Sequence, residues 1–135
     1  MKGILTDVHM TPEVEDLVRV MQQEPWTIFW EHLGLVLYRF KDFGLAPDAP
    51  DLEIWHCCQA EQLIFITNNR NKNAVDSLEA AIRADHMPTS LPVFTIGKLD
   101  RLQRSKAYAD RVVKSLYGYL LAIDRVRGAG RLYLP

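Results

Sequence analysis

Leu63-Ile64-Phe65-Ile66-Thr67-Asn68-Asn69-Arg70-Asn71 is the stretch that decides the fold. Its first five residues are a short run of branched and aromatic side chains, which is typical of a strand buried on both faces in a parallel sheet. A second apolar run, Gly3-Ile4-Leu5-Thr6, ends in Asp7. In open α/β sheets the functional crevice lies outside the carboxyl ends of the strands. We therefore expect Asp7 and the asparagine-rich segment after Thr67 to face the same crevice.

The remaining chain alternates between strand and helix patterns. Strands are predicted over residues 2–6, 35–39, 63–67, 93–96 and 131–134. Helices are predicted from residue 11 toward Pro25, for a turn or two within 26–34, and over 52–61, 75–85 and 100–127, with a polar loop over 68–73. Strands that alternate with helices imply βαβ units. We therefore predict a single domain over residues 1–135 with a three-layer, Rossmann-like α/β fold, in which helices cover both faces of a mostly parallel sheet.

Two helix starts carry residues that favour capping. Thr11 precedes Pro12, which suits the first position of a helix, so Thr11 is the predicted N-cap of the first helix. Asp51 is the predicted N-cap of the helix over 52–61. Because Thr11 already caps the first helix, we expect Asp7 to be available for a functional role.

Size and composition are those of an ordinary globular domain. The chain has 135 residues, of which 48% are hydrophobic and 24% charged. No apolar run reaches the length of about 18 residues that a membrane helix needs. The chain opens with Met1-Lys2-Gly3 and shows no apolar core of a signal peptide. We therefore expect a cytoplasmic protein without a membrane partner.

Charge is distributed unevenly along the chain. Residues 1–66 contain 4 Lys or Arg and 11 Asp or Glu, a net charge of −7, whereas residues 101–135 contain 8 and 2, a net charge of +6. We favour a solvated helix face for the basic segment, paired with the acidic half of the same or another subunit. The second interpretation is binding to nucleic acid. That binding would depend on Arg101, Arg104, Arg111 and Lys114.

The polar residues at the predicted crevice are donors suited to a hard metal ion. An isolated carboxylate is costly to bury unless it is paired or binds a metal, so Asp7 is a candidate ligand. Asp51 and Glu53 begin a helix that could reach the same crevice. His9 is a candidate general base, although we favour a bystander role. Gly-rich phosphate loops, nucleophile elbows and HExxH helices are absent from the sequence, so those enzyme classes lose support.

The asparagines after Thr67 allow two interpretations. Asn68, Asn69 and Asn71 offer neutral oxygen atoms to a cation, but they bring no charge, and Mg²⁺ prefers carboxylates. The alternative is a polar turn, because asparagine tolerates the left-handed backbone conformation.

Three segments in this order resemble the PIN-like nuclease superfamily, in particular its small stand-alone bacterial branch linked to toxin–antitoxin pairs. They are the strand that ends in Asp7, the segment Gly44-Leu45-Ala46-Pro47-Asp48-Ala49-Pro50-Asp51-Leu52-Glu53-Ile54, and the strand and loop over 63–71. The resemblance covers residues 1–85 and rests on the spacing of these segments. It implies a hydrolase that cleaves RNA with Mg²⁺ or Mn²⁺ held by carboxylates.

The resemblance also implies roles for individual residues. Asp7, Asp51 and Thr67 match the family pattern, whereas Asn69 and Asn71 stand where that family has aspartates. The implied catalytic residues are Asp7, Asp51, Glu53, Asn69 and Asn71. The implied metal ligands are Asp7, Asp51 and Asn69, and the implied substrate contacts are Thr67, Asn68, Arg70 and Lys72. The loss of two carboxylates weakens cation binding by an amount on the order of several kcal/mol.

Three functional hypotheses follow. The first is a metal-dependent, toxin-like ribonuclease or its weakened descendant. The second is a non-catalytic PIN-like module that binds RNA or a protein partner such as an antitoxin. The third is a doubly wound domain of another class, such as a receiver-like signalling domain, although the acid pair that such a domain needs after the first strand is missing. Trp26 and Trp30 are candidates for a homodimer face, but we favour core packing for both.

Overall fold

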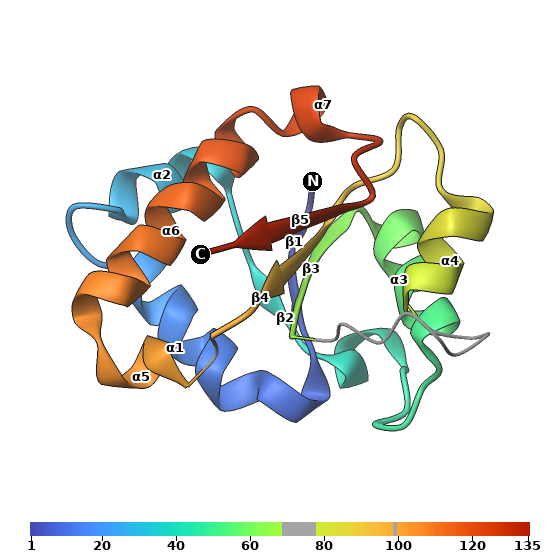
Figure 1. Cartoon of the computed structure of the whole chain (residues 1–135), viewed down its shortest axis with the longest axis horizontal. Helices are drawn as coiled ribbons and strands as arrows, with labels where there is room; N and C mark the ends of the chain where they lie inside the picture. Colours follow the sequence, from blue (N-terminus) through green and yellow to red (C-terminus); the bar gives the residue numbers. More distant parts are fainter. Residues whose placement is uncertain (69–77, 99) are drawn as a thin grey trace.

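A parallel sheet forms the middle layer of the molecule in the computed structural model, which describes residues 1–68, 78–98 and 100–135 (Figure 1). The strands of these residues are β1 (Gly3–Thr6), β2 (Leu37–Tyr38), β3 (Leu63–Thr67), β4 (Val93–Ile96) and β5 (Arg131–Leu134). They lie in the order β2-β1-β3-β4-β5, and every neighbouring pair is parallel. The predicted α/β class and the five predicted strands are therefore confirmed, although β2 is shorter than expected.

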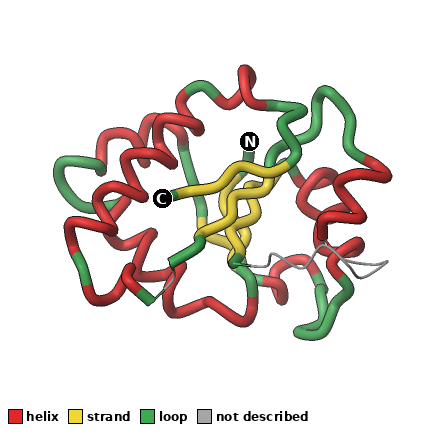
Figure 2. The backbone as a smooth tube through the Cα atoms, viewed as in Figure 1, coloured by secondary structure: helices red, strands yellow, loops and turns green. Residues whose placement is uncertain are grey.

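Helices cover both faces of the sheet, as predicted (Figures 1 and 2). One face carries α1 (Thr11–Met21), α2 (Thr27–Leu33), α5 (Arg101–Arg104) and α6 (Lys106–Leu121). The other face carries α3 (Asp51–Glu61) and α4 (Leu78–Asp85), while α7 (Ile123–Val126) precedes β5. Two 3₁₀ turns, Val8–Met10 and Phe40–Phe43, follow β1 and β2. Among the described residues, no helix has both the length and the apolar character that crossing a bilayer requires.

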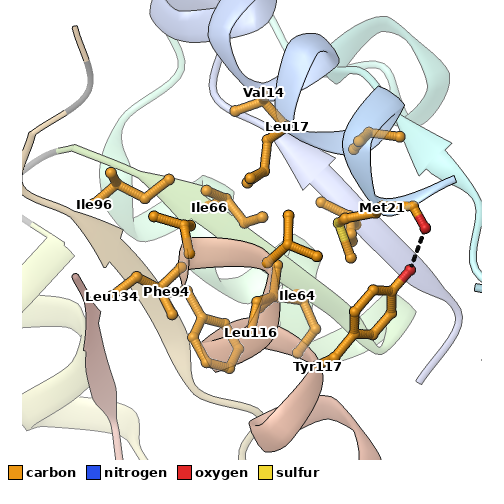
Figure 3. Close-up of a cluster of buried hydrophobic side chains, with 14 of the residues drawn as sticks. Val14, Leu17, Met21, Ile64, Ile66, Phe94, Ile96, Leu116, Tyr117 and Leu134 are labelled. Atoms are coloured by element: carbon orange, nitrogen blue, oxygen red, sulfur yellow. Dashed lines mark hydrogen bonds between the residues drawn. The ribbon is translucent and has the colours of Figure 1, made fainter. Parts of the chain in front are cut away.

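The sheet separates two hydrophobic cores, because successive side chains of a strand point to opposite faces. Ile64 and Ile66 of β3 belong to the core beneath α1 and α6 (Figure 3). Leu63 and Phe65 of the same strand belong to the core beneath α3 and α4. All five residues of β3 are buried. Burial on both faces is the physical reason for the unbroken apolar run with which this strand begins.

Close approach between β1 and β2 depends on Gly3. A Cβ atom at this position would lie 2.2 Å from the Val36 carbonyl oxygen and 2.9 Å from the Tyr38 ring. A larger residue would therefore push β2 away from β1. Because β2 leads into the 3₁₀ turn over 40–43, Gly3 also helps to position the loop that follows.

The start of α1 differs from the prediction. Thr11 is the first residue of the helix, and Met10 holds the cap position without a side-chain bond. Asp7 caps the preceding 3₁₀ turn, because its Oδ1 accepts a hydrogen bond from the His9 amide at 3.0 Å. The Thr11 hydroxyl instead donates to the main-chain oxygens of Asp7 and Val8. The expectation that Thr11 relieves Asp7 of a capping role is therefore wrong.

Asp51 also differs from its predicted capping role. Pro50 holds the N-cap position of α3, and Asp51 is the first helical residue. The Asp51 Oδ2 accepts a hydrogen bond at 3.0 Å from the amide of Leu78, the first described residue of α4. The carboxylate therefore joins α3 to α4. Residues 75–77 of the predicted fourth helix lie outside the described residues.

The single helix predicted over 100–127 is wrong, because the chain is divided there into α5, α6 and α7. Ser105, between α5 and α6, has an extended backbone, and its hydroxyl accepts a hydrogen bond from the Tyr108 amide. Ser105 thus caps α6 and satisfies an amide that has no partner within the helix. Ala122 interrupts the pattern again between α6 and α7. The helical spacing of apolar residues continues across Ser105 and Ala122, so it does not reveal either break.

In the part of the chain that the structure describes, the acidic and basic segments form no ion pairs with each other. Over the described ranges, no ion pair joins a carboxylate of residues 1–66 to a Lys or Arg of residues 101–135. Arg111 and Lys114 are exposed on α6, so the expected solvated helix face is confirmed. The expected pairing within the chain is wrong, and pairing with another subunit stays a prediction.

Candidate functional site

A pocket of about 330 Å³ opens at the carboxyl ends of β1 and β3. Its lining among the described residues consists of Asp7, Val8, His9, Phe40, Pro47, Asp48, Ala49, Asp51, Ile54 and Asn68. In the order β2-β1-β3, the chain leaves β1 for one neighbour and returns to the strand on the other side. Doubly wound domains bind ligands where the strand order reverses in this way. The structure thus brings Asp7, Asp51 and Asn68 to one crevice, as expected.

Asp7 is held at the pocket by two hydrogen bonds. Its Oδ1 accepts from the His9 amide, and its Oδ2 accepts from the Thr67 hydroxyl at 2.9 Å. Thr67 is fully buried at the end of β3, so water has little access to this contact. An ionised carboxylate has about four lone-pair sites, which leaves capacity on Asp7 for a further ligand. Thr67 therefore orients the Asp7 carboxylate. Thr67 itself, a predicted substrate contact, is not among the described residues that line the pocket.

Three carboxylates line the pocket, those of Asp7, Asp48 and Asp51. Asp51 is half-buried and bonded to α4, whereas Asp48 is exposed in the loop before α3. The sequence analysis did not single out Asp48 as a site residue, although it lies only three residues before Asp51. None of the described residues that line the pocket is a Lys or Arg. The described lining of the pocket therefore carries a net negative charge, which favours a cation.

Other predicted site residues fall outside this group. Glu53 is exposed on α3 and is absent from the described pocket lining. Its charge instead acts on Cys57: burial raises the pKa of that thiol most, and the charges of Glu61 and Glu53 add to the effect. The roles predicted for Asn69, Arg70, Asn71 and Lys72 concern positions outside the described residues.

A smaller cavity of about 210 Å³ adjoins the acidic pocket. Both share the apolar side chains of Val8, Phe40 and Pro47. Arg39 and Lys41 also line the smaller cavity. The described lining of this cavity thus combines an apolar wall with two cations, of which Arg39 pairs with Glu15.

The capacity of the pocket for a metal ion rests on few side chains. Nowhere in the described ranges do three or more His, Cys, Asp or Glu residues form a group that could hold a metal. Mg²⁺, however, is usually bound by one or two carboxylates, with water and substrate phosphates completing its shell. The carboxylates of the pocket could serve as ligands in a Mg²⁺ site that is completed by water and substrate. The predicted ligand Asn69 lies outside the described residues.

No protein-family model matches this chain, and comparisons with curated proteins and with solved structures found no match either. Many unrelated functions share the doubly wound architecture, so the function has to be argued from the site.

Proposed function

We propose that this protein is a PIN-like, metal-dependent ribonuclease of the cytoplasm, with its active site at the carboxyl ends of β1 and β3. The observation that supports the proposal most directly is the gathering of Asp7, Asp48 and Asp51 at one pocket, whose described lining contains no Lys or Arg. Carboxylates that line one pocket repel one another and attract a cation. The resemblance of residues 1–85 to toxin-like PIN nucleases adds support.

A Mg²⁺ or Mn²⁺ ion fits the donors of this pocket. Carboxylate oxygens are ligands that both ions prefer, and the hydrogen bonds to Asp7 leave lone pairs on its carboxylate. One or two of the described residues Asp7, Asp48 and Asp51 would hold the ion, with water and substrate phosphates completing its shell. When bound, it would supply Lewis-acid activation of water and neutralise charge on a phosphoryl group.

The protein's own residues would orient the substrate around these acids. Thr67 and the His9 amide fix the Asp7 carboxylate, so its oxygens face the pocket in one orientation. Asn68 is exposed at the pocket and offers both a donor and an acceptor to a ribose or phosphate. The His9 ring, exposed at the same pocket, is positioned to accept or donate a proton.

A second candidate function is a PIN-like module that binds RNA or a protein partner without catalysis. The observation that favours it is the lack of a three-residue metal group within the described ranges. Asn69 and Asn71, at positions where the resemblance implies carboxylates, point the same way. Asp7 and Asp51 would then be structural, since they join β1 to β3 and α3 to α4.

Calorimetric titration of Mg²⁺ and Mn²⁺ into the purified protein separates the two candidates. Asp7→Asn and Asp48→Asn each remove one charge from the pocket, whereas Glu31→Gln removes one from the exposed surface of α2 on the opposite face. We expect Asp7→Asn to abolish metal binding, Asp48→Asn to weaken it about tenfold, and Glu31→Gln to leave it unchanged. No binding at millimolar metal would reject the ribonuclease and select the binding module.

Cleavage of end-labelled single-stranded RNA completes the test. The ribonuclease proposal requires cleavage with Mn²⁺ that disappears in EDTA and in Asp7→Asn, while Glu31→Gln retains it. Circular dichroism must first show that each variant is folded, because Asp7 also bonds to Thr67. Cleavage that persists in folded Asp7→Asn would assign the activity to another site or to a contaminant.

A further inference from the structure

Two arginine side chains converge on one buried tyrosine near the carboxyl ends of β4 and β5. The guanidinium carbon of Arg101 lies 4.8 Å from the centroid of the Tyr108 ring, and that of Arg111 lies 5.7 Å from it. Both distances are within the roughly 6 Å over which an aromatic ring attracts a cation. We call Arg101, Tyr108 and Arg111 the arginine–tyrosine cluster.

Neither arginine of the cluster forms an ion pair with a carboxylate in the part of the chain that the structure describes. Neighbouring cations do have such partners: Arg104 pairs with Asp100, and Lys106 pairs with Asp110 at 3.6 Å. Two positive charges are therefore gathered at one ring without neutralisation. Like charges repel one another, so this arrangement favours a bound anion.

Tyr108 is itself fixed in place. It is 1% exposed, its hydroxyl donates to the Pro135 carbonyl oxygen, and the main chain of Lys98 lies beside that hydroxyl. Burial raises the pKa of the hydroxyl, so it stays protonated and keeps its bond to Pro135 at neutral pH. A fixed ring positions the two guanidinium groups in advance, which reduces the entropy lost when a ligand binds.

We propose that the arginine–tyrosine cluster, together with the exposed Lys98, binds phosphate groups of single-stranded RNA. This site rests on the proposed function, because it holds the backbone of the same substrate away from the acidic pocket. Guanidinium groups match phosphate oxygens through paired, charge-assisted hydrogen bonds. Contacts to the backbone supply most of the affinity for a nucleic acid, whatever its base sequence.

The strand order places the cluster and the acidic pocket along one edge of the sheet. Asp7 follows β1, Asn68 follows β3, Lys98 lies two residues after β4, and Pro135 follows β5. Neighbouring strands are about 4.8 Å apart, so the ends of β1 and β5 are about 15 Å apart. Grooves for single strands, which hold several nucleotides, cover such a distance. One phosphate would lie at the acidic pocket while others lie on the cations.

Fluorescence anisotropy with a labelled uridine oligonucleotide tests this site. The assay contains EDTA, so neither metal binding nor cleavage affects the result. The double variant Arg101→Gln/Arg111→Gln removes two cations that lack carboxylate partners. The matched control Lys2→Gln/Lys106→Gln removes two cations that pair with carboxylates, Glu61 and Asp110, with the same change in net charge. Each protein is measured over a range of salt concentrations.

We expect the cluster variant to bind RNA at least about tenfold more weakly and to show a salt slope reduced by about 1.4, the value for two lost contacts to a single strand. The control should change both quantities far less. Equal losses in the two double variants would overturn the proposal, as would an absence of RNA binding by the native protein. If the cluster variant does not fold, Arg111→Gln is compared with Lys106→Gln, and half the change in slope is expected.

Competition separates RNA from other anions. Uridine monophosphate and inorganic phosphate should compete much more weakly than the oligonucleotide, since only the polymer contacts several cations at once. If uridine monophosphate or inorganic phosphate competes as well as the oligonucleotide, the cluster binds a small phosphate-bearing molecule. If polyglutamate competes equally well, the cluster binds an acidic protein. Either result would overturn the proposal. Lost metal binding at Asp7 would leave the RNA result untouched, so failure of the ribonuclease and failure of this site are distinguishable.

Discussion

Both carboxylate oxygens of Asp7 accept hydrogen bonds, one from the His9 amide and one from the Thr67 hydroxyl. Because Thr67 is buried, water competes little for this contact, and a hydrogen bond to a charged group contributes about 1.5–3 kcal/mol. The contact joins the end of β1 to the end of β3. The orientation of a proposed metal ligand therefore depends on a residue of another strand.

A double-mutant cycle measures this contact. We expect Asp7→Ala and Thr67→Val each to lower the free energy of unfolding by about 1–3 kcal/mol. The double variant should lose less than the sum, by about 1 kcal/mol, because both single changes remove the same bond. Urea unfolding followed by circular dichroism supplies the values. The exposed Thr89→Val serves as a control that should add to Asp7→Ala. Additivity of the first pair within about 0.5 kcal/mol would show that the contact contributes little.

Helices α1 and α6 are joined by a hydrogen bond through the core. The Tyr117 hydroxyl donates to the Met21 carbonyl oxygen at 2.8 Å (Figure 3). Met21 ends α1, so its carbonyl has no partner further along that helix. Burial raises the pKa of Tyr117 to about 12. The contact therefore links the packing of two helices to the protonation of one phenol.

Tyr117→Phe is expected to lower the free energy of unfolding at pH 7 by about 1–3 kcal/mol, because it leaves a buried carbonyl unpaired. In the protein without this substitution, the Tyr117 phenol has a pKa of about 10 in the unfolded state and about 12 in the folded state. Its contribution is fully present below pH 10 and is lost as the pH rises toward 12. Tyr117→Phe should therefore flatten the decline of stability between these values in urea titrations, whereas Tyr119→Phe on the same helix should retain the native slope. Unchanged slopes in both variants would contradict the assignment.

On the scale of the whole molecule, β3 belongs to both cores, since Ile64 and Ile66 face one and Leu63 and Phe65 face the other. A strand shared between two layers makes the stability of each layer depend on the other. We therefore expect the domain predicted from the sequence to unfold in one step.

Three tryptophans allow the two faces to be followed separately. Trp26 and Trp30 pack against the core beneath α1 and α6, which confirms the favoured interpretation of both, and Trp55 lies in the core beneath α3 and α4. In Trp55→Phe, the remaining fluorescence comes from Trp26 and Trp30, on the face covered by α1 and α6. In Trp26→Phe/Trp30→Phe, it comes from Trp55, on the face covered by α3 and α4. In each variant, the urea midpoint from fluorescence should equal the midpoint from circular dichroism. Separate midpoints would mean that the faces unfold independently.

The sequence correctly predicted whether a segment is a helix or a strand where burial leaves a clear pattern of apolar residues. Residues 63–67 are a strand because a run of branched, apolar side chains suits burial on both faces. The capping roles of Asp7 and Asp51 were not accessible in the same way. A carboxylate bonds to whichever amide the fold brings near, and for Asp51 that amide belongs to Leu78, on another helix. Local spacing likewise gave no sign that Ser105 would divide a long apolar pattern.

The sequence by itself determined the parallel α/β class and placed Asp7 and Asn68 at strand ends, because a change from apolar to polar residues marks where a buried strand leaves the sheet. Only the tertiary structure decided that Asp48 joins the acidic pocket and that Glu53 is absent from its described lining. It also decided that Arg101 and Arg111 share the Tyr108 ring. These arrangements depend on how loops and helices pack against the finished sheet, and local sequence patterns do not encode that packing.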